Sequence, residues 1–185
     1  MALQFKLVIF FVGSIGFAWL SRSSLRDFHS HGFYRFFAWE AILILVLLNL
    51  KYWFFEPFSI NQLISWSLLI VSLYLIIHGF QLFRQAGKLD PERKDPHLIG
   101  IEKTTELVTV GAYRYIRHPF YSSLLFLAWG VFFKHPTWIG GSLTIIASVF
   151  LVLTAKVEEA ENILYFGDVY QDYMKETKMF IPFIF

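Results

Sequence analysis

Residues able to bind or activate a ligand gather in two short stretches of the C-terminal half. The first is Arg117-His118-Pro119-Phe120-Tyr121, in which Pro119 fits the first turn of a helix. Arg117 and His118 would then lie beside that helix's N-terminus, where free amides and the positive end of the helix dipole favour an anionic group. Snorkelling arginines in an aromatic membrane belt would give the same pattern, so spacing alone leaves both interpretations open.

The second stretch is acidic and follows the last apolar run of the chain. It holds Glu158, Glu159 and Glu161. Carboxylates oppose the dipole at a helix C-terminus, so they favour a helix that continues beyond the apolar run. A carboxylate at the membrane face can pair with a ligand's ammonium or sulfonium. A solvated helical face paired with Lys156 is the competing interpretation.

An aromatic stripe comes next. Phe166, Tyr170 and Tyr173 follow a 4,3 spacing and therefore share one helical face. Such a stripe is more often packing than a surface on which a base stacks.

Other polar residues carry weaker signals. Glu40 lies inside an apolar run, where a carboxylate is costly and should face the bundle or a cavity. His29 and His31 have no further metal ligands nearby, and the chain has no cysteine. We therefore expect no metal site, no disulfide and no cysteine nucleophile.

The composition indicates which solvent these residues meet. The chain has 185 residues, of which 56% are hydrophobic and 16% charged, and its mean hydropathy is +0.53. Soluble domains are roughly 45–50% apolar and roughly 25% charged. A bilayer is thus the expected solvent, and a net charge of +2 is too small to suggest a nucleic-acid partner.

Five apolar runs are candidate membrane helices, for which ~20 residues are needed. The runs are Leu3–Leu20, Phe36–Phe55, Leu63–Phe83, Phe120–Phe133 and Thr137–Ala155. The fourth would cover only ~21 Å of a ~30 Å hydrocarbon core, so it must recruit flanking residues, thin the bilayer or start inside a polar pocket. We predict an all-α membrane bundle of about five helices in one domain (1–185), with a three-helix part (1–83) and a C-terminal part (84–185).

The basic residues predict the orientation. Of the 16 Lys and Arg residues, 13 fall in Ser21–Arg35, in Arg84–His118 or in the tail from Lys156. The positive-inside rule places these segments in the cytoplasm and the N-terminus outside. The first run lacks a basic n-region and a small-x-small cleavage site, so we expect it to be retained as an anchor.

Several motifs together resemble the isoprenylcysteine carboxyl methyltransferase and phospholipid methyltransferase superfamily. They are Leu107-Val108-Thr109-x-Gly111-x-Tyr113, Arg117-His118-Pro119-x-Tyr121, Glu158-Glu159, Phe166-Gly167-x-x-Tyr170-x-x-Tyr173 and Phe180-Ile181-Pro182. The resemblance covers residues 97–183. It implies a membrane enzyme that holds S-adenosylmethionine between the loop before the fourth span and the helix after the fifth.

The resemblance also implies residue roles. The cofactor contacts carried over by position are Thr105, Glu106, Leu107, Val108, Tyr113, His118, Pro119, Phe120, Tyr121 and Glu158. Glu158 can neutralise the cofactor's amino group, and His118 with backbone amides can take its carboxylate or adenine edge.

The acceptor side departs from the family pattern. Ser123 replaces a glycine, Met179 replaces an arginine, and Thr154 replaces an arginine suited to gripping a carboxylate. Arg117, Glu159 and Thr154 are the residues we assign to catalysis.

Three acceptors remain open, and each would reach the site from the bilayer: a prenylated cysteine carboxylate, a phospholipid amine or another hydrophobic small molecule. Carboxyl O-methylation is slightly favoured, with Arg114, Arg117 or Lys156 compensating for Thr154. Phospholipid amine N-methylation would need a base, for which the candidates are Glu159, Glu161 and Glu40. Outside methyl transfer, the alternatives are an NADPH-dependent sterol or enone reductase and a non-catalytic membrane scaffold.

Overall fold

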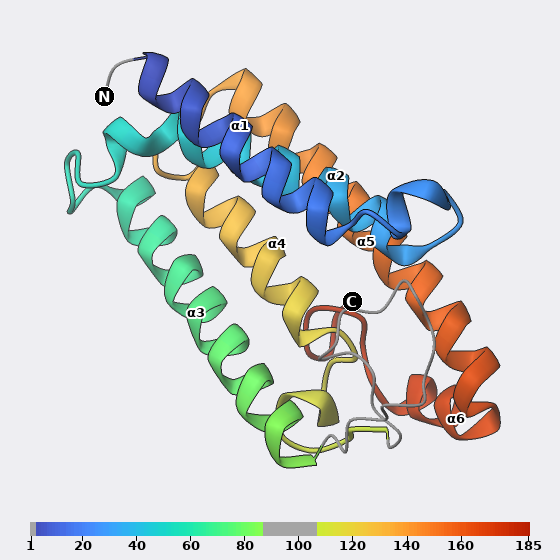
Figure 1. Cartoon of the computed structure of the whole chain (residues 1–185). Helices are drawn as coiled ribbons and strands as arrows, with labels where there is room; N and C mark the ends of the chain where they lie inside the picture. Colours follow the sequence, from blue (N-terminus) through green and yellow to red (C-terminus); the bar gives the residue numbers. More distant parts are fainter. Residues whose placement is uncertain (1–2, 87–106) are drawn as a thin grey trace.

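Helices account for most of residues 3–86 and 107–185, the parts of the chain that this computed structural model describes (Figure 1). Four helices are long and apolar enough to cross a membrane. They are α1 (Leu3–Leu20), α2 (His31–Asn49), α3 (Ile60–Ala86) and α5 (Trp138–Phe166). The shorter helices are α4 (Pro119–Phe132) and α6 (Asp168–Glu176). The predicted all-α membrane bundle is confirmed.

Helix α2 differs most from its predicted bounds. It begins at His31, whereas the predicted apolar run begins at Phe36. It ends at Asn49 and is followed by a 3₁₀ turn, Leu50–Tyr52, whereas the predicted run extends to Phe55. His31 and Arg35 are polar, so the sequence placed them in a loop, yet both are buried. Partners on a distant helix, described below, make this first turn and a half part of the bundle.

Helix α4 is the short fourth run, and its 14 residues fall below the length of a membrane span. Pro119 stands in its first turn, as predicted, and His118 is the N-cap residue. Pro119, Tyr121 and Ser122 are buried. The helix therefore starts inside the protein, which is one of the three solutions expected for so short a run.

Helix α5 continues far beyond Ala155, as the glutamates predicted, and ends at Phe166. Gly167 then adopts φ +63°, a left-handed conformation that glycine accepts without steric cost. The chain turns there into α6, so the predicted aromatic stripe spans a break between two helices.

The helices place the loops at two opposite ends (Figure 1). One end, here called the polar end, holds the α1–α2 connection (21–30), residues 107–118, α6 and the C-terminal tail (177–185). The other, the hairpin end, holds the α2–α3 connection (50–59) and the α4–α5 turn (133–137). Helices α3 and α4 run side by side, as do α2 and α5.

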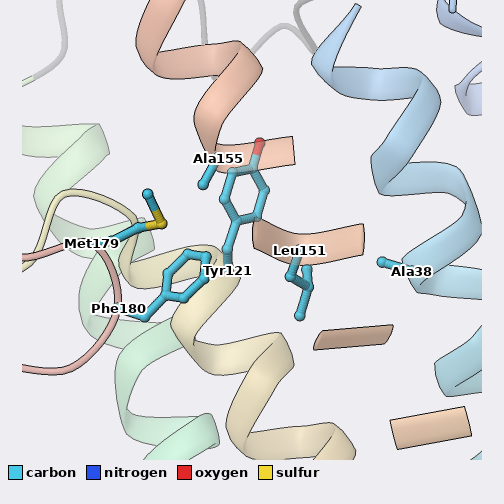
Figure 2. Packing of buried hydrophobic residues seen from close by; sticks show 6 residues of the cluster. All are labelled: Ala38, Tyr121, Leu151, Ala155, Met179 and Phe180. Carbon is cyan, nitrogen blue, oxygen red and sulfur yellow. The ribbon is translucent and has the colours of Figure 1, made fainter. Parts of the chain in front are cut away.

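A buried cluster joins four segments near the polar end (Figure 2). Its members are Ala38 of α2, Tyr121 of α4, Leu151 and Ala155 of α5, and Met179 and Phe180 of the tail. Ala38 and Ala155 are fully buried, and small residues at such positions let helices approach closely in a membrane. This packing holds the start of α4 against α5 and the tail.

Candidate active site

The C-terminal tail pairs with the residues that precede α4. The amide of Arg117 donates to the carbonyl of Lys178 at 2.8 Å, and the amide of Lys178 donates to the carbonyl of Tyr115 at 3.0 Å. The amide of His118 donates to the carbonyl of Met179 at 3.2 Å. These bonds fix the backbone of the Arg117-His118 motif from the outer side.

Gly111 brings the beginning of this segment close to α3. It has φ +62°, and a Cβ atom there would lie 2.5 Å from Leu82 Cδ1 and 3.0 Å from His78 Nε2. Only glycine combines this conformation with this approach. The glycine of the sequence motif therefore has a structural role, because it lets the backbone turn close to α3.

Arg117 locks three segments together. Its Nε donates to Glu159 Oε1 at 2.6 Å, and its Nη1 donates to the carbonyls of Thr177 at 2.5 Å and Met174 at 3.3 Å. The Arg117 and Glu159 side chains are only 9% and 8% exposed. In such a buried pair the loss of one partner leaves an uncompensated charge. The guanidinium is therefore held in place by α5 and the tail.

His118 lies between two carboxylates and an aromatic wall. Its Nε2 is 3.3 Å from Glu159 Oε1, and its Nδ1 is 3.8 Å from Glu158 Oε2. The ring stacks on Tyr121, with centroids 5.4 Å apart, and meets Phe180 at 6.2 Å. Both ring nitrogens of His118 therefore face carboxylates of α5.

Glu158 has capacity left for a ligand. Its Oε2 is buried, and no hydrogen-bond donor reaches it from the residues described by the structure. Leaving a buried carboxylate oxygen without a donor is unfavourable. A ligand's ammonium is a group that would satisfy it, as the sequence predicted for this position.

Two buried tyrosines of α6, Tyr170 and Tyr173, lie beside the site. Tyr173 donates its hydroxyl to the carbonyl of Tyr113 at 2.6 Å, and the rings of Phe166 and Tyr170 stack at 6.3 Å. Burial raises the pKa of Tyr173. Burial and then the charge of Glu158 raise the pKa of Tyr170. Both phenols therefore stay protonated and can act as donors.

A cavity of about 260 Å³ lies between the segment before α4 and helix α6. Its lining residues are Leu107, Thr109, Arg114, Val169, Asp172, Tyr173, Glu176 and Thr177. Arg114, considered above as a cation for a carboxylate acceptor, borders this cavity together with two acidic residues.

The structure brings together five of the predicted site residues, Arg117, His118, Tyr121, Glu158 and Glu159. The other predicted positions have different surroundings. Thr105 and Glu106 lie outside the described residues. Leu107 is half-buried and Val108 and Tyr113 are buried in the segment before α4.

The remaining predicted positions lie in α2, α4 and α5. Phe120 packs edge-on against Phe80 of α3, with ring centroids 5.5 Å apart. Thr154 is fully buried, and its hydroxyl donates to the carbonyl of Phe150 at 2.7 Å. Glu40 accepts a hydrogen bond of 2.7 Å from Ser14 of α1, so it faces the bundle as expected.

One buried pair had no counterpart in the sequence analysis. His31 of α2 is completely buried, and its Nδ1 lies 2.5 Å from Glu161 Oε2. Its amide donates to the other carboxylate oxygen of Glu161 at 3.3 Å. The usable signal was the spacing of His31, Arg35 and Ala38, which share a helical face. The described ranges contain no cluster of His, Asp and Glu suited to a metal ion.

Comparison with known proteins gives the chain a family context. The phospholipid methyltransferase family matches residues 60–168. The methanethiol S-methyltransferase of Pseudomonas deceptionensis is 28% identical over 121 residues, which are 64% of this chain and 42% of that protein.

Two further relatives give a similar result. Methanethiol S-methyltransferase 1 of Bradyrhizobium diazoefficiens is 29% identical over 64% of this chain and 39% of its own length. The methanethiol S-methyltransferase of Crocosphaera subtropica is 26% identical over 65% and 44%, respectively. The matches thus cover less than half the length of these relatives. No solved structure matches the chain.

Proposed function

Because the chain belongs to the phospholipid methyltransferase family, we propose that it is a membrane methyltransferase that uses S-adenosylmethionine. The observation that carries the proposal is the juxtaposition of His118, Glu158 and Glu159 at the start of α4 and the extension of α5. The family match includes all three residues.

The residues present fit this cofactor. When bound, S-adenosylmethionine would supply a methyl group carried on its sulfonium. An acceptor would take this methyl group by in-line attack, with S-adenosylhomocysteine as the leaving group. Glu158 would hold the cofactor's ammonium, because its buried Oε2 has no donor in the described chain. The aromatic rings of Tyr121, Phe166 and Tyr170 offer apolar surface near the carboxylates.

The chain's own contribution to the reaction is alignment and charge placement. Arg117 holds Glu159, and Glu159 in turn holds His118 at the N-cap of α4. Fixed reactant positions remove much of the entropic barrier to a bimolecular displacement. An imidazole nitrogen of His118 can accept a proton from the acceptor, with both carboxylates stabilising the imidazolium.

We propose an apolar acceptor that must lose a proton, of which a thiol is the first example. Arg117 is engaged by Glu159 and two carbonyls, and the Thr154 hydroxyl by its own helix. Neither residue is poised to grip a carboxylate. The relatives described above are named methanethiol S-methyltransferases, which supports a thiol acceptor. Carboxyl O-methylation, favoured by the family resemblance, is the second candidate and needs a cation from elsewhere.

A methyl-label assay separates these acceptors. Membranes containing the protein are incubated with methyl-labelled cofactor and, in turn, with methanethiol, a prenylated cysteine and an aminophospholipid. A methylated thiol leaves as a volatile sulfide before any treatment, a methyl ester releases methanol only after alkali, and an N-methyl group stays bound. We expect label in the first fraction. Label only in the second or third would overturn the thiol and identify the other acceptor.

We also propose that the polar end faces the cytoplasm. The segments that hold 13 of the 16 basic residues include its loops and tail. The chain has no cysteine, and Trp138 at the hairpin end is 95% exposed. A Trp138→Cys variant should therefore react with an impermeant thiol reagent from outside the cell. Labelling only after the membrane is opened would contradict this orientation.

A further inference from the structure

The N-terminal turns of α2 lie against the part of α5 that carries the glutamates. The two helices are antiparallel, because His31 pairs with Glu161 while Phe37, further along α2, stacks on Phe150 at 5.3 Å. Ala38 packs in the same cluster as Ala155. These contacts fix which turn of α2 faces which turn of α5.

Arg35 falls between these two fixed points. It follows His31 by one turn and precedes Ala38 by one turn, so it lies opposite the stretch between Ala155 and Glu161. That stretch carries Glu158 and Glu159. Arg35 is only 2% exposed. The register of the two helices therefore puts Arg35, a buried residue, at about the same level of the bundle as the two carboxylates.

The surroundings of Arg35 keep its guanidinium in a defined place. Its Cζ lies 5.1 Å from the ring centroid of Trp39, within the range of a cation–π interaction. Its Nη2 would be 3.5 Å from a Cβ atom at Gly32, and the same Cβ would collide with Ser24 Oγ. Glycine at position 32 thus leaves room for Ser24 of the loop, while the distance to Arg35 is an ordinary van der Waals contact.

From this placement we propose that Arg35 binds a ligand carboxylate in the methyl-transfer site. The inference rests on the proposed function. An arginine offers five N–H donors in a planar fork that matches a carboxylate, and one partner does not exhaust them. Glu158 is suited to an ammonium, so the two residues together match the zwitterionic end of an amino acid. The methionine part of the cofactor has that chemistry, and a carboxylate acceptor shares half of it.

Arg35 is also outside the residues that the family matches, which begin at position 60. The carboxylate-binding arginine expected from the resemblance is replaced by Thr154 of α5. Arg35 of α2 would therefore supply the positive charge that position 154 of α5 lacks.

The test compares two cofactors that differ by one group. S-adenosylmethionine and its decarboxylated form are titrated by calorimetry into the detergent-purified full chain and into Arg35→Gln and Arg35→Lys variants. Arg22→Gln is the matched control, since Arg22 is an exposed arginine whose Cζ lies 5.0 Å from the ring centroid of Trp19.

If Arg35 binds the cofactor's carboxylate, Arg35→Gln should weaken S-adenosylmethionine binding by about ten- to hundredfold. It should leave the affinity for the decarboxylated form unchanged, and Arg35→Lys should restore part of the loss. If it binds the acceptor's carboxylate, both cofactor affinities stay constant while the KM of a carboxylate acceptor rises. An equal loss for both cofactors would indicate a structural role and overturn the inference, as would no change in any of these values. Failure of the unaltered chain to bind either cofactor would instead contradict the proposed function.

Discussion

The two ends of the bundle each bury a cation, and they do so in opposite ways. At the polar end, Arg117 is paired with the carboxylate of Glu159 and two carbonyls. At the hairpin end, Lys134 is 4% exposed and donates to Gln62 Oε1 at 2.9 Å, with Nζ 3.4 Å from the ring centroid of Trp66. No carboxylate pairs with Lys134 in the described chain.

The polar end therefore keeps a charged pair, whereas the buried lysine of the hairpin end has a structural role. Arginine keeps its charge when buried, and Glu159 balances it. Lysine loses its proton more readily, and burial lowers the pKa of Lys134 to about 8. Gln62 also donates to the carbonyls of Tyr52 and Lys134, so this cluster ties the two loops of the hairpin end together. The polar end is thus built to keep charges that a ligand can use.

Removing Glu159 should have the largest effect. In Glu159→Ala, Arg117 stays buried without its anion, which we expect to cost about 3–5 kcal/mol of unfolding free energy and to abolish methyl transfer. Denaturant unfolding in detergent measures the stability. The control is Asp172→Asn, which breaks an exposed pair with Lys175 and should change stability by less than about 1 kcal/mol. Equal effects of the two substitutions would contradict the account of the polar end.

Lys134 should make stability depend on pH in the alkaline range. Its pKa in the folded chain is about 8, against 10.5 for the unfolded reference. Between these values the unfolded chain binds more protons, so the unfolding free energy should rise with pH, by at most about 3 kcal/mol. Lys134→Met should remove this rise and keep cofactor binding. A parallel pH profile for both proteins would show that the lysine is not desolvated.

Glu158→Gln should separate binding from stability. The substitution keeps the shape of the side chain and removes the charge proposed to meet the cofactor's ammonium. We expect unfolding to change little, and S-adenosylmethionine affinity to fall about ten- to hundredfold. Calorimetry measures the affinity. Unchanged binding, or a loss of stability as large as that of Glu159→Ala, would place Glu158 in the structural network instead.

Tyr173→Phe should have the smallest effect. It removes one buried hydrogen bond, from the phenol to the carbonyl of Tyr113. The expected cost is about 1–2 kcal/mol, with a modest rise in the KM for cofactor. Tyr74→Phe, at an exposed position of α3, is the control and should be neutral. Identical values for both variants would show that α6 does not brace the segment before α4.

The sequence predicts the fold well where the signal is local. Hydropathy gives α1 with both of its bounds, because the helix is almost entirely apolar and its one charged residue, Lys6, lies near its start. It fails at the start of α2, because His31 and Arg35 are polar. Their burial depends on Glu161 and the packing of α5, more than a hundred residues along the chain. Hydropathy cannot detect such long-range pairing, and the only local signal was the helical spacing of His31, Arg35 and Ala38.

In the candidate site, too, the features with a local sequence signal were predictable and the long-range contacts were not. The proximity of His118, Glu158 and Glu159 follows from two motifs that flank a helical hairpin, so it was predictable. The pairing of Lys178 and Met179 with the backbone of Arg117 and His118 was not, since backbone hydrogen bonds are compatible with almost any side chains. The tail therefore joins the site without a sequence signature of its own, and the roles of all these residues stay predictions.

The central claim is that the polar end binds S-adenosylmethionine. Its most direct test is calorimetric titration of the detergent-purified chain with S-adenosylmethionine, S-adenosylhomocysteine and NADPH. We expect saturable binding of the two adenosyl ligands in competition with each other, and none of NADPH. Binding of NADPH alone would assign the site to a reductase, and binding of no ligand would indicate a scaffold; either result contradicts the account.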